Sequence, residues 1–130
     1  MLPDLEGMWR IERRIIHQNA RFEGILNFKR SGDDLIYTEK GLMRLPTATT
    51  EAYRSYIYRP SAQEWQVFYD DGRPFLNLKF EQGVARYTHD CTPDIYRATF
   101  KIKNKNEWIC AFLVSGPRKN YFAVSRMTKL

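Results

Sequence analysis

Residues 65–80, with the sequence WQVFYDDGRPFLNLKF, indicate the class of fold. Apolar and aromatic side chains occupy alternate positions on both sides of a central Asp-Gly pair. They are Trp65, Val67 and Tyr69 before the pair, and Leu76, Leu78 and Phe80 after it. Alternation with a period of two is typical of a half-buried strand, and Asp71-Gly72 suits the positive φ angles of a tight hairpin turn. The stretch therefore predicts two antiparallel strands.

The same alternation recurs along the whole chain, between short segments rich in Gly, Pro, Asn and Asp. The expected strands cover residues 8–17, 22–28, 35–42, 52–59, 65–69, 76–80, 85–89, 96–102, 108–114 and 121–127. A sheet of this many strands leaves exposed edges unless it closes on itself. We therefore expect an all-β fold, a single antiparallel up-and-down β-barrel of about ten strands that spans residues 1–130. A two-sheet sandwich is the alternative.

Length, composition and charge limit the classes of protein to which this chain can belong. The chain has 130 residues, of which 43% are hydrophobic and 15% aromatic, so it can form one ordered domain with a real core. The net charge is +6, but the basic residues are scattered, and we expect no nucleic-acid partner. The longest apolar run, residues 109–114, is too short to span a bilayer. Without a signal-peptide pattern at Met1, we expect a cytoplasmic protein.

The cysteines and histidines favour neither metal nor redox chemistry. Cys91 and Cys110 do not form a C-x-x-C pair, so reduced thiols are expected, although the sequence leaves a disulfide open. His17 and His89 are the only histidines, and no carboxylates cluster near them at the spacing of metal ligands. We predict no metal site and no cofactor.

The two ends of the chain carry a recognisable pair of features. Gly7-Met8-Trp9 is a Gly-x-Trp on the first expected strand, and Arg126 lies on the last one. This arrangement resembles the lipocalin and wider calycin pattern. The resemblance implies that Trp9 closes one end of the barrel and that Arg126 packs across it. A guanidinium over an indole face contributes about 1 kcal/mol.

More of the chain resembles an uncharacterised bacterial and fungal family of short lipocalin-like β-barrels. The matching stretches are residues 5–9, 37–41, 70–75, 89–96 and 116–119. They are spread over nearly the whole sequence, so the resemblance is global. It implies a calycin-like fold and no established activity. The resemblance to fatty-acid-binding proteins covers size and strand number but not their helix pair.

Two turn regions hold polar residues that a small apolar barrel does not need. At the first, Asp71 can pair with Arg73, which makes Asp71 and Gly72 structural residues; alternatively, Arg73 lies at the barrel mouth and binds a carboxylate or phosphate. At the second, Asp94 can orient His89 as a general base, with Glu39 or Tyr96 as the acid. The competing interpretation is a structural cluster of hydrogen bonds that joins two strands.

Alternation also predicts which polar side chains face the interior. The candidate ligand-binding residues are Tyr37, Glu39, Arg54, Tyr56, Arg73, His89 and Tyr96. Tyrosine walls with an arginine suit a compact anionic or aromatic ligand better than a long acyl chain. The alternative is a filled core in which these groups satisfy one another, and an error of one residue in register turns all of them to solvent.

Three functions follow from these features. The first is a barrel that binds a small anionic or aromatic ligand in its interior. The second is an acid–base enzyme of the decarboxylase, isomerase or cyclase type, in which His89, Asp94 and Glu39 are the candidate catalytic residues. The third is an auxiliary domain that binds a protein partner through its outer face. The sequence indicates neither the ligand nor the oligomeric state.

Overall fold

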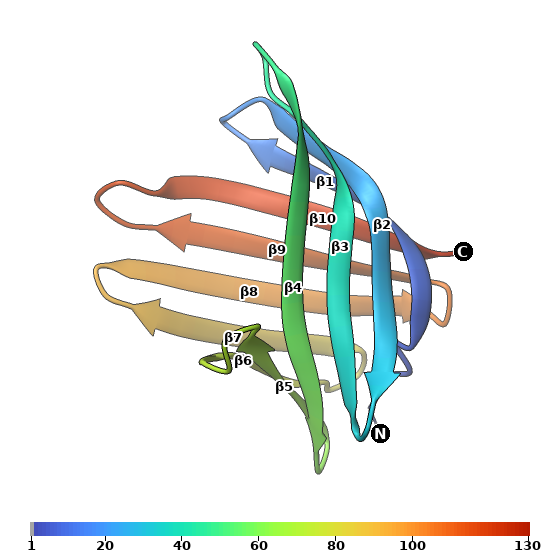
Figure 1. The fold of residues 1–130 in the computed structure, drawn as a ribbon. Helices are drawn as coiled ribbons and strands as arrows, with labels where there is room; N and C mark the ends of the chain where they lie inside the picture. Colours follow the sequence, from blue (N-terminus) through green and yellow to red (C-terminus); the bar gives the residue numbers. More distant parts are fainter. Residues whose placement is uncertain (1) are drawn as a thin grey trace.

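Ten antiparallel strands account for nearly all of residues 2–130, which are the residues that the computed structural model describes (Figure 1). The strands are β1 (Gly7–Ile16), β2 (Ala20–Ser31), β3 (Asp34–Arg44), β4 (Thr49–Ser61), β5 (Glu64–Tyr69), β6 (Pro74–Lys79), β7 (Val84–Cys91), β8 (Asp94–Asn104), β9 (Glu107–Ser115) and β10 (Asn120–Lys129). Within residues 2–130, no helix is long and apolar enough to cross a membrane.

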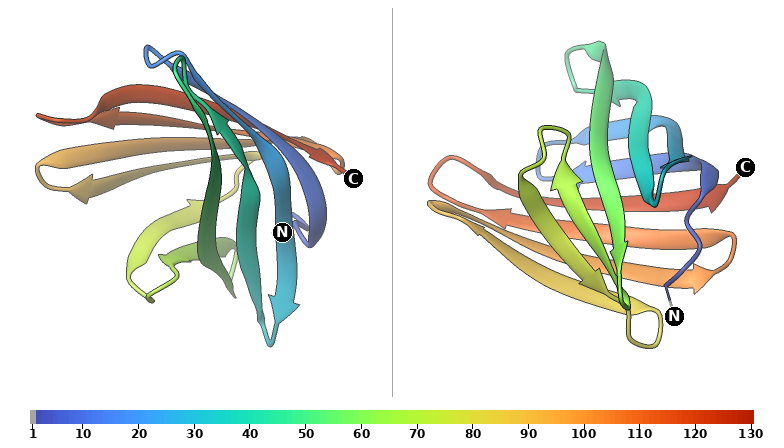
Figure 2. Two further views of the ribbon diagram at one scale, coloured as in Figure 1. Left: turned by 45° about the horizontal axis from the view of Figure 1, so that its top comes forward. Right: turned by 60° about the horizontal axis from the view of Figure 1, so that its bottom comes forward.

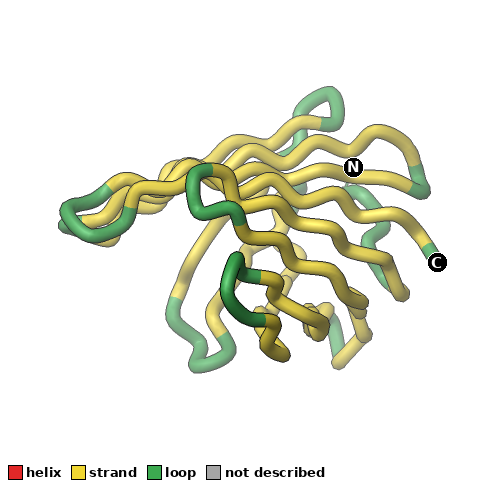
Figure 3. The backbone as a smooth tube through the Cα atoms, turned by 90° about the horizontal axis from the view of Figure 1, so that it is seen from above, coloured by secondary structure: helices red, strands yellow, loops and turns green. Residues whose placement is uncertain are grey.

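The strands form one sheet in the order β6-β5-β4-β3-β2-β1-β10-β9-β8-β7. Apart from β6 and β7, strands that follow each other in the chain are paired, and the first strand also pairs with the last, from Trp9 opposite Lys129 to Ile16 opposite Phe122. Strands β2–β4 run at a steep angle to β7–β10 (Figures 1 and 2). Seen from above, the strands curve around a single interior (Figure 3). The prediction of a ten-stranded up-and-down barrel is confirmed.

The barrel is nearly closed, with a seam between β6 and β7. No hydrogen-bonded ladder joins these two strands in the part of the chain that the structure describes. Side chains bridge the seam instead, because the rings of Phe75 on β6 and His89 on β7 meet edge to face with centroids 5.4 Å apart. The seam is therefore held by packing and not by the backbone.

Two glycines allow a close approach of backbones on the other side of the barrel. Gly24 on β2 lies directly opposite Gly41 on β3. A Cβ atom on Gly24 would collide with the backbone of Lys40, and one on Gly41 would collide with that of Glu23. Glycine at such a position is typical of a tight bend at a barrel corner.

Trp9, near the start of β1, belongs to the buried core of the barrel. Its side chain is fully buried, its indole N–H donates to the Leu5 carbonyl at 3.0 Å, and Trp108 packs against it at a right angle. The cation that packs on Trp9 is Lys129, whose Nζ lies 4.7 Å from the ring centroid. Lys129 Nζ also donates to the Glu6 carbonyl, beside Gly7, which has a φ of 116°.

The prediction that Arg126 packs across Trp9 is wrong. Arg126 faces outward and pairs with Glu107 at 2.8 Å on the barrel surface. The reason is strand alternation, because the buried residues Ser125 and Met127 on either side of it point inward. Lys129, two residues beyond Met127, shares the inward face and takes the place expected for Arg126.

Candidate functional site

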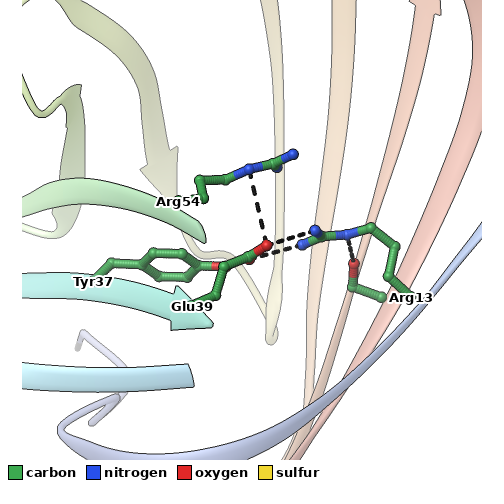
Figure 4. A network of polar contacts seen from close by, with 5 residues as sticks. Arg13, Tyr37, Glu39 and Arg54 are labelled. Carbon is green, nitrogen blue, oxygen red and sulfur yellow. Dashed lines mark hydrogen bonds and ion pairs between the residues drawn. The ribbon is translucent and has the colours of Figure 1, made fainter. Parts of the chain in front are cut away.

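A network of four buried polar side chains crosses the barrel interior (Figure 4). Arg13 on β1 donates from its two terminal nitrogens to the two carboxylate oxygens of Glu39 on β3, at 2.7 and 2.9 Å. Arg13 Nε donates to Ser125 Oγ on β10 at 2.7 Å, and the Tyr37 hydroxyl donates to Glu39. The network thus ties β3, β1 and β10 together on the inner side of the sheet.

The charges in this network stabilise each other. Burial alone would raise the pKa of Glu39, but hydrogen bonds and the charge of Arg13 outweigh it and hold that pKa below its usual value. Burial would lower the pKa of Arg13, and Glu39 reverses this effect. Burial and the Glu39 charge raise the pKa of Tyr37 well above its usual value. Glu39 is therefore an ionised acceptor surrounded by donors.

Arg54 on β4 adds a second guanidinium beside the same carboxylate. Its Nε lies 3.9 Å from Glu39 Oε2, and 47% of its side chain is exposed, whereas the side chain of Glu39 is only 3% exposed. Arg13 and Arg54 together carry two positive charges against the single charge of Glu39. One positive charge therefore remains, and it lies at Arg54, the more exposed of the two arginines.

Arg54 borders a pocket of about 420 Å³ in the barrel, which is partly open to solvent. Its walls are mainly aromatic. The lining residues are Arg13, Ile15, Gln18, Arg54, Tyr56, Tyr69, Phe75, Tyr96, Phe112, Tyr121 and Ala123. The rings pack on one another around Phe75, with centroids 4.6 Å from Tyr69, 5.5 Å from Tyr56 and 6.0 Å from Phe112. Burial raises the pKa of Tyr56 and Tyr121, so their hydroxyls stay neutral.

The predicted ligand-binding residues are only partly brought together. Arg54, Tyr56 and Tyr96 line the pocket. Tyr37 and Glu39 do face the interior, but they lie beneath Arg13 and Arg54 and do not line this pocket. Their place is in the network that supports the two arginines.

Arg73 lies outside the pocket lining. Its Nε donates to Asp71 Oδ2 at 2.7 Å, its backbone N–H donates to Asp71 Oδ1, and its guanidinium lies over the ring of Tyr69. Gly72 has a φ of 90°, as the turn requires. The interpretation of this segment as a hairpin whose carboxylate pairs with Arg73 matches the geometry. The guanidinium touches the pocket only through Tyr69.

The expected pair of His89 and Asp94 does not form. Asp94 lies 3.7 Å from Lys119 Nζ, and Lys119 also donates to the Tyr96 hydroxyl at 3.0 Å. His89 is half-buried between the rings of Phe75 and Tyr96. The hairpin between β7 and β8 explains the separation, because its register places His89 opposite Tyr96 and Asp94 opposite Cys91.

Five residues of the site are not among the predicted ligand-binding residues: Arg13, Tyr69, Phe75, Phe112 and Tyr121. Alternation contained the signal for Arg13, because it lies between the inward residues Ile11 and Ile15 on β1. Arginine is seldom buried, which favours the opposite assignment when the sequence alone is considered. Its partner lies 26 residues away on another strand, and no local pattern reveals that pairing.

Residues 2–130 contain no group of three His, Cys, Asp or Glu side chains placed to hold a metal ion.

Both cysteines are free thiols, Cys91 exposed and Cys110 buried. Burial raises the pKa of the Cys110 thiol to about 11.

Comparison with solved structures confirms the fold. The S-type phycobiliprotein lyase CPES from Guillardia theta has a TM-score of 0.70 and 7% identity, over 97% of this chain and 88% of that chain. A redesigned β-barrel, mFAP1, bound to DFHBI, has a TM-score of 0.51 and 10% identity over 96% and 94% of the two chains. A fluorescence-activating β-barrel designed de novo has a TM-score of 0.51 and 12% identity over 97% and 94%. At these identities the similarity shows the fold alone.

A family described as "Family of unknown function (DUF6314)" matches residues 5–129. None of the curated proteins matches the chain.

Proposed function

Because the chain belongs to DUF6314, a family of unknown function, we propose a function from its own geometry: the barrel binds a small, flat, aromatic anion in the pocket beside Arg54. The uncompensated charge of Arg54 carries this proposal. The charge of Arg13 is neutralised by Glu39, whereas Arg54 approaches Glu39 only to 3.9 Å and keeps a half-exposed side chain at the pocket wall. A carboxylate can accept two parallel hydrogen bonds from such a planar guanidinium.

The walls of the pocket support an aromatic body for this ligand. Six of its lining residues are Tyr or Phe, and these rings offer flat faces and edges on several sides: Tyr56, Tyr69, Phe75, Tyr96, Phe112 and Tyr121. Aromatic pairs gain about 0.5–1.5 kcal/mol beyond the burial of their area. The volume of about 420 Å³ lies in the range of pockets that hold small organic molecules.

The structural neighbours are consistent with such a role. One of them is a redesigned barrel bound to the small molecule DFHBI. That barrel is similar in fold only, so the similarity supports the capacity of this architecture to hold a ligand and not the identity of the ligand here.

The geometry gives less support to the two alternatives. An acid–base enzyme requires His89, Glu39 and an arginine in one cavity, but Glu39 is held by Arg13 and His89 does not line the pocket. A partner-binding domain would have a filled interior and one exposed aromatic patch. The interior of this barrel instead contains a pocket. On the outside, Tyr53 is the most exposed of the large hydrophobic side chains, at 67%.

A fluorescence titration with 2-naphthoate tests the proposal, with the neutral 2-naphthalenemethanol and the acyclic decanoate as comparison ligands. We expect 2-naphthoate to bind more tightly than both. The variant Arg54→Gln is expected to weaken 2-naphthoate by about tenfold to a hundredfold, because hydrogen bonds to charged groups contribute about 1.5–3 kcal/mol. Binding of the neutral analogue should be unchanged.

Arg59→Gln is the matched control for this experiment. Arg59 lies on the same strand but on the outer face, where it pairs with Asp34. It should bind 2-naphthoate like the original protein. Equal binding of 2-naphthoate by the Arg54 variant, or a preference for decanoate, would contradict the proposal.

A further inference from the structure

A second, smaller cavity of about 30 Å³ lies deeper in the barrel. It shares five lining residues with the main pocket, so the two spaces meet at one cross-section of the barrel. The shared residues are Arg13, Arg54, Tyr56, Phe75 and Phe112. The remaining walls of this inner chamber come from the deep core: Tyr37, Tyr58, Val67, Leu76, Phe100, Trp108 and Cys110. Its volume suits one group of one or two heavy atoms.

Trp108, which lines the chamber, has an unused hydrogen-bond donor. Trp108 is 2% exposed, and its Nε1 is the one buried side-chain N or O atom in residues 2–130 that lacks a hydrogen-bond partner. Phe100 stacks on the indole with centroids 5.9 Å apart, and Trp9 stands at a right angle to it. These neighbours fix the plane of the ring. A buried N–H without an acceptor is costly, and such groups normally have a partner in the functional state.

We infer that the inner chamber is a subsite for a small uncharged hydrogen-bond acceptor on the ligand, such as a hydroxyl, carbonyl or ether oxygen, which accepts from Trp108 Nε1. The inference rests on the proposed function, since the ligand in the main pocket supplies this substituent. It narrows the ligand class to aromatic anions that carry an oxygen substituent near the end held by Arg54.

The chemistry of the chamber walls excludes a second charge on that substituent. Apart from the two arginines at its entrance, the chamber is lined by apolar side chains, neutral tyrosines and a thiol. Burial raises the pKa of Tyr58 and Cys110, which keeps both groups uncharged. An anionic group placed there would lose its hydration without a free cation, because Arg13 is paired with Glu39 and Arg54 binds the carboxylate of the ligand. A neutral oxygen needs only the donor that Trp108 provides.

The test compares the binding of 2-naphthoate to the full chain with the binding of three isomeric hydroxy derivatives, 1-, 3- and 6-hydroxy-2-naphthoate. We expect the 1- or 3-hydroxy isomer, whose oxygen lies next to the carboxylate, to bind about threefold to tenfold more tightly than 2-naphthoate, as one neutral hydrogen bond contributes, and the 6-hydroxy isomer to show no such gain. In Trp108→Phe, which keeps a ring but removes the N–H, this advantage should disappear while 2-naphthoate still binds. Trp65→Phe is the control, because the Trp65 indole donates to Pro3 and lines neither cavity.

Indole NMR signals give an independent readout that requires no folded Trp108 variant. The chain has three tryptophans, and the indole N–H groups of Trp9 and Trp65 already donate to backbone carbonyls. The favoured isomer should shift the Trp108 indole proton downfield and leave the other two in place.

The outcomes separate the two proposals. If 2-naphthoate binds but no isomer gains a Trp108-dependent advantage, and the Trp108 signal does not move, the inner subsite is refuted and the proposed function stands. If neither 2-naphthoate nor any isomer binds, the proposed function fails and the subsite fails with it.

Discussion

The Arg13 guanidinium and the Glu39 carboxylate lie in the barrel interior as a two-point pair, with N···O distances of 2.7 and 2.9 Å, although 26 residues separate them in the sequence. Their side chains are only 8% and 3% exposed. The loss of one partner would therefore leave an uncompensated charge in a low-dielectric core, which is far more costly than the loss of a surface pair.

Glu39→Gln should destabilise the protein by about 3–5 kcal/mol, because it leaves Arg13 charged, buried and unpaired. Urea unfolding followed by tryptophan fluorescence measures the change. The exposed residue Glu51 provides the control, and Glu51→Gln should stay within about 0.5 kcal/mol of the original protein. The double variant with Arg13→Met and Glu39→Leu should be less destabilised than Glu39→Gln; an equal or greater loss would contradict the argument.

The same pair predicts how stability changes with pH. The pKa of Glu39 in the folded protein lies below its value in the unfolded chain, which is about 4.3. Its stabilisation is therefore complete above the unfolded value and is lost as the pH falls through the folded value. The difference in unfolding free energy between the original protein and Glu39→Gln should be constant from about pH 7 to about pH 5 and shrink below about pH 4. A difference that persists unchanged in more acidic solution would exclude this role.

The architecture was predictable because alternation and turn residues are local signals. The Asp71-Gly72 turn and the inward face of Leu35, Tyr37 and Glu39 follow from periodicity alone, and the structure has them as expected. The site depends on which strands meet across the interior. Arg13 and Glu39 are not adjacent in sequence, and the register that separates His89 from Asp94 is set by the turn between β7 and β8. Side-chain partners of this kind carry no local sequence signal.

Lys129 should contribute to stability through Trp9, and Arg126 should not. A half-buried cation–π contact such as that of Lys129 and Trp9 contributes about 1–2 kcal/mol, whereas an exposed ion pair such as that of Arg126 and Glu107 contributes less than about 1 kcal/mol. Lys129→Met should therefore lower the unfolding free energy by about 1–2 kcal/mol, and Arg126→Met by about 0.5 kcal/mol or less. Denaturant titration of the two variants checks this order, and a larger effect at Arg126 would reverse the assignment.

The close approach of β2 and β3 predicts a severe effect of a single methyl group. Gly41→Ala places a Cβ against the backbone of Glu23 and Gly24, which cannot move without displacing β2. We expect a loss of more than about 2 kcal/mol, since overpacking against a rigid neighbour costs about 1–3 kcal/mol or more. Gly32→Ala is the control: nothing lies near its Cβ position, and only its φ of 61° is unfavourable, at about 1 kcal/mol. Similar thermal midpoints for the two variants would argue against the steric explanation.

The two cysteines should react at very different rates with a thiol reagent. Thiolate is the reactive form, and at about pH 8 a thiol with a pKa of about 11, such as that of Cys110, is ionised in only about 0.1% of molecules. Cys110 is also 7% exposed, whereas Cys91 is exposed near the end of β7. In the native protein one thiol should react quickly, and in urea two should react. Cys91→Ser should abolish the fast phase and Cys110→Ser should preserve it; two fast thiols in the folded protein would show that Cys110 is accessible and that the core around the inner chamber is open to solvent.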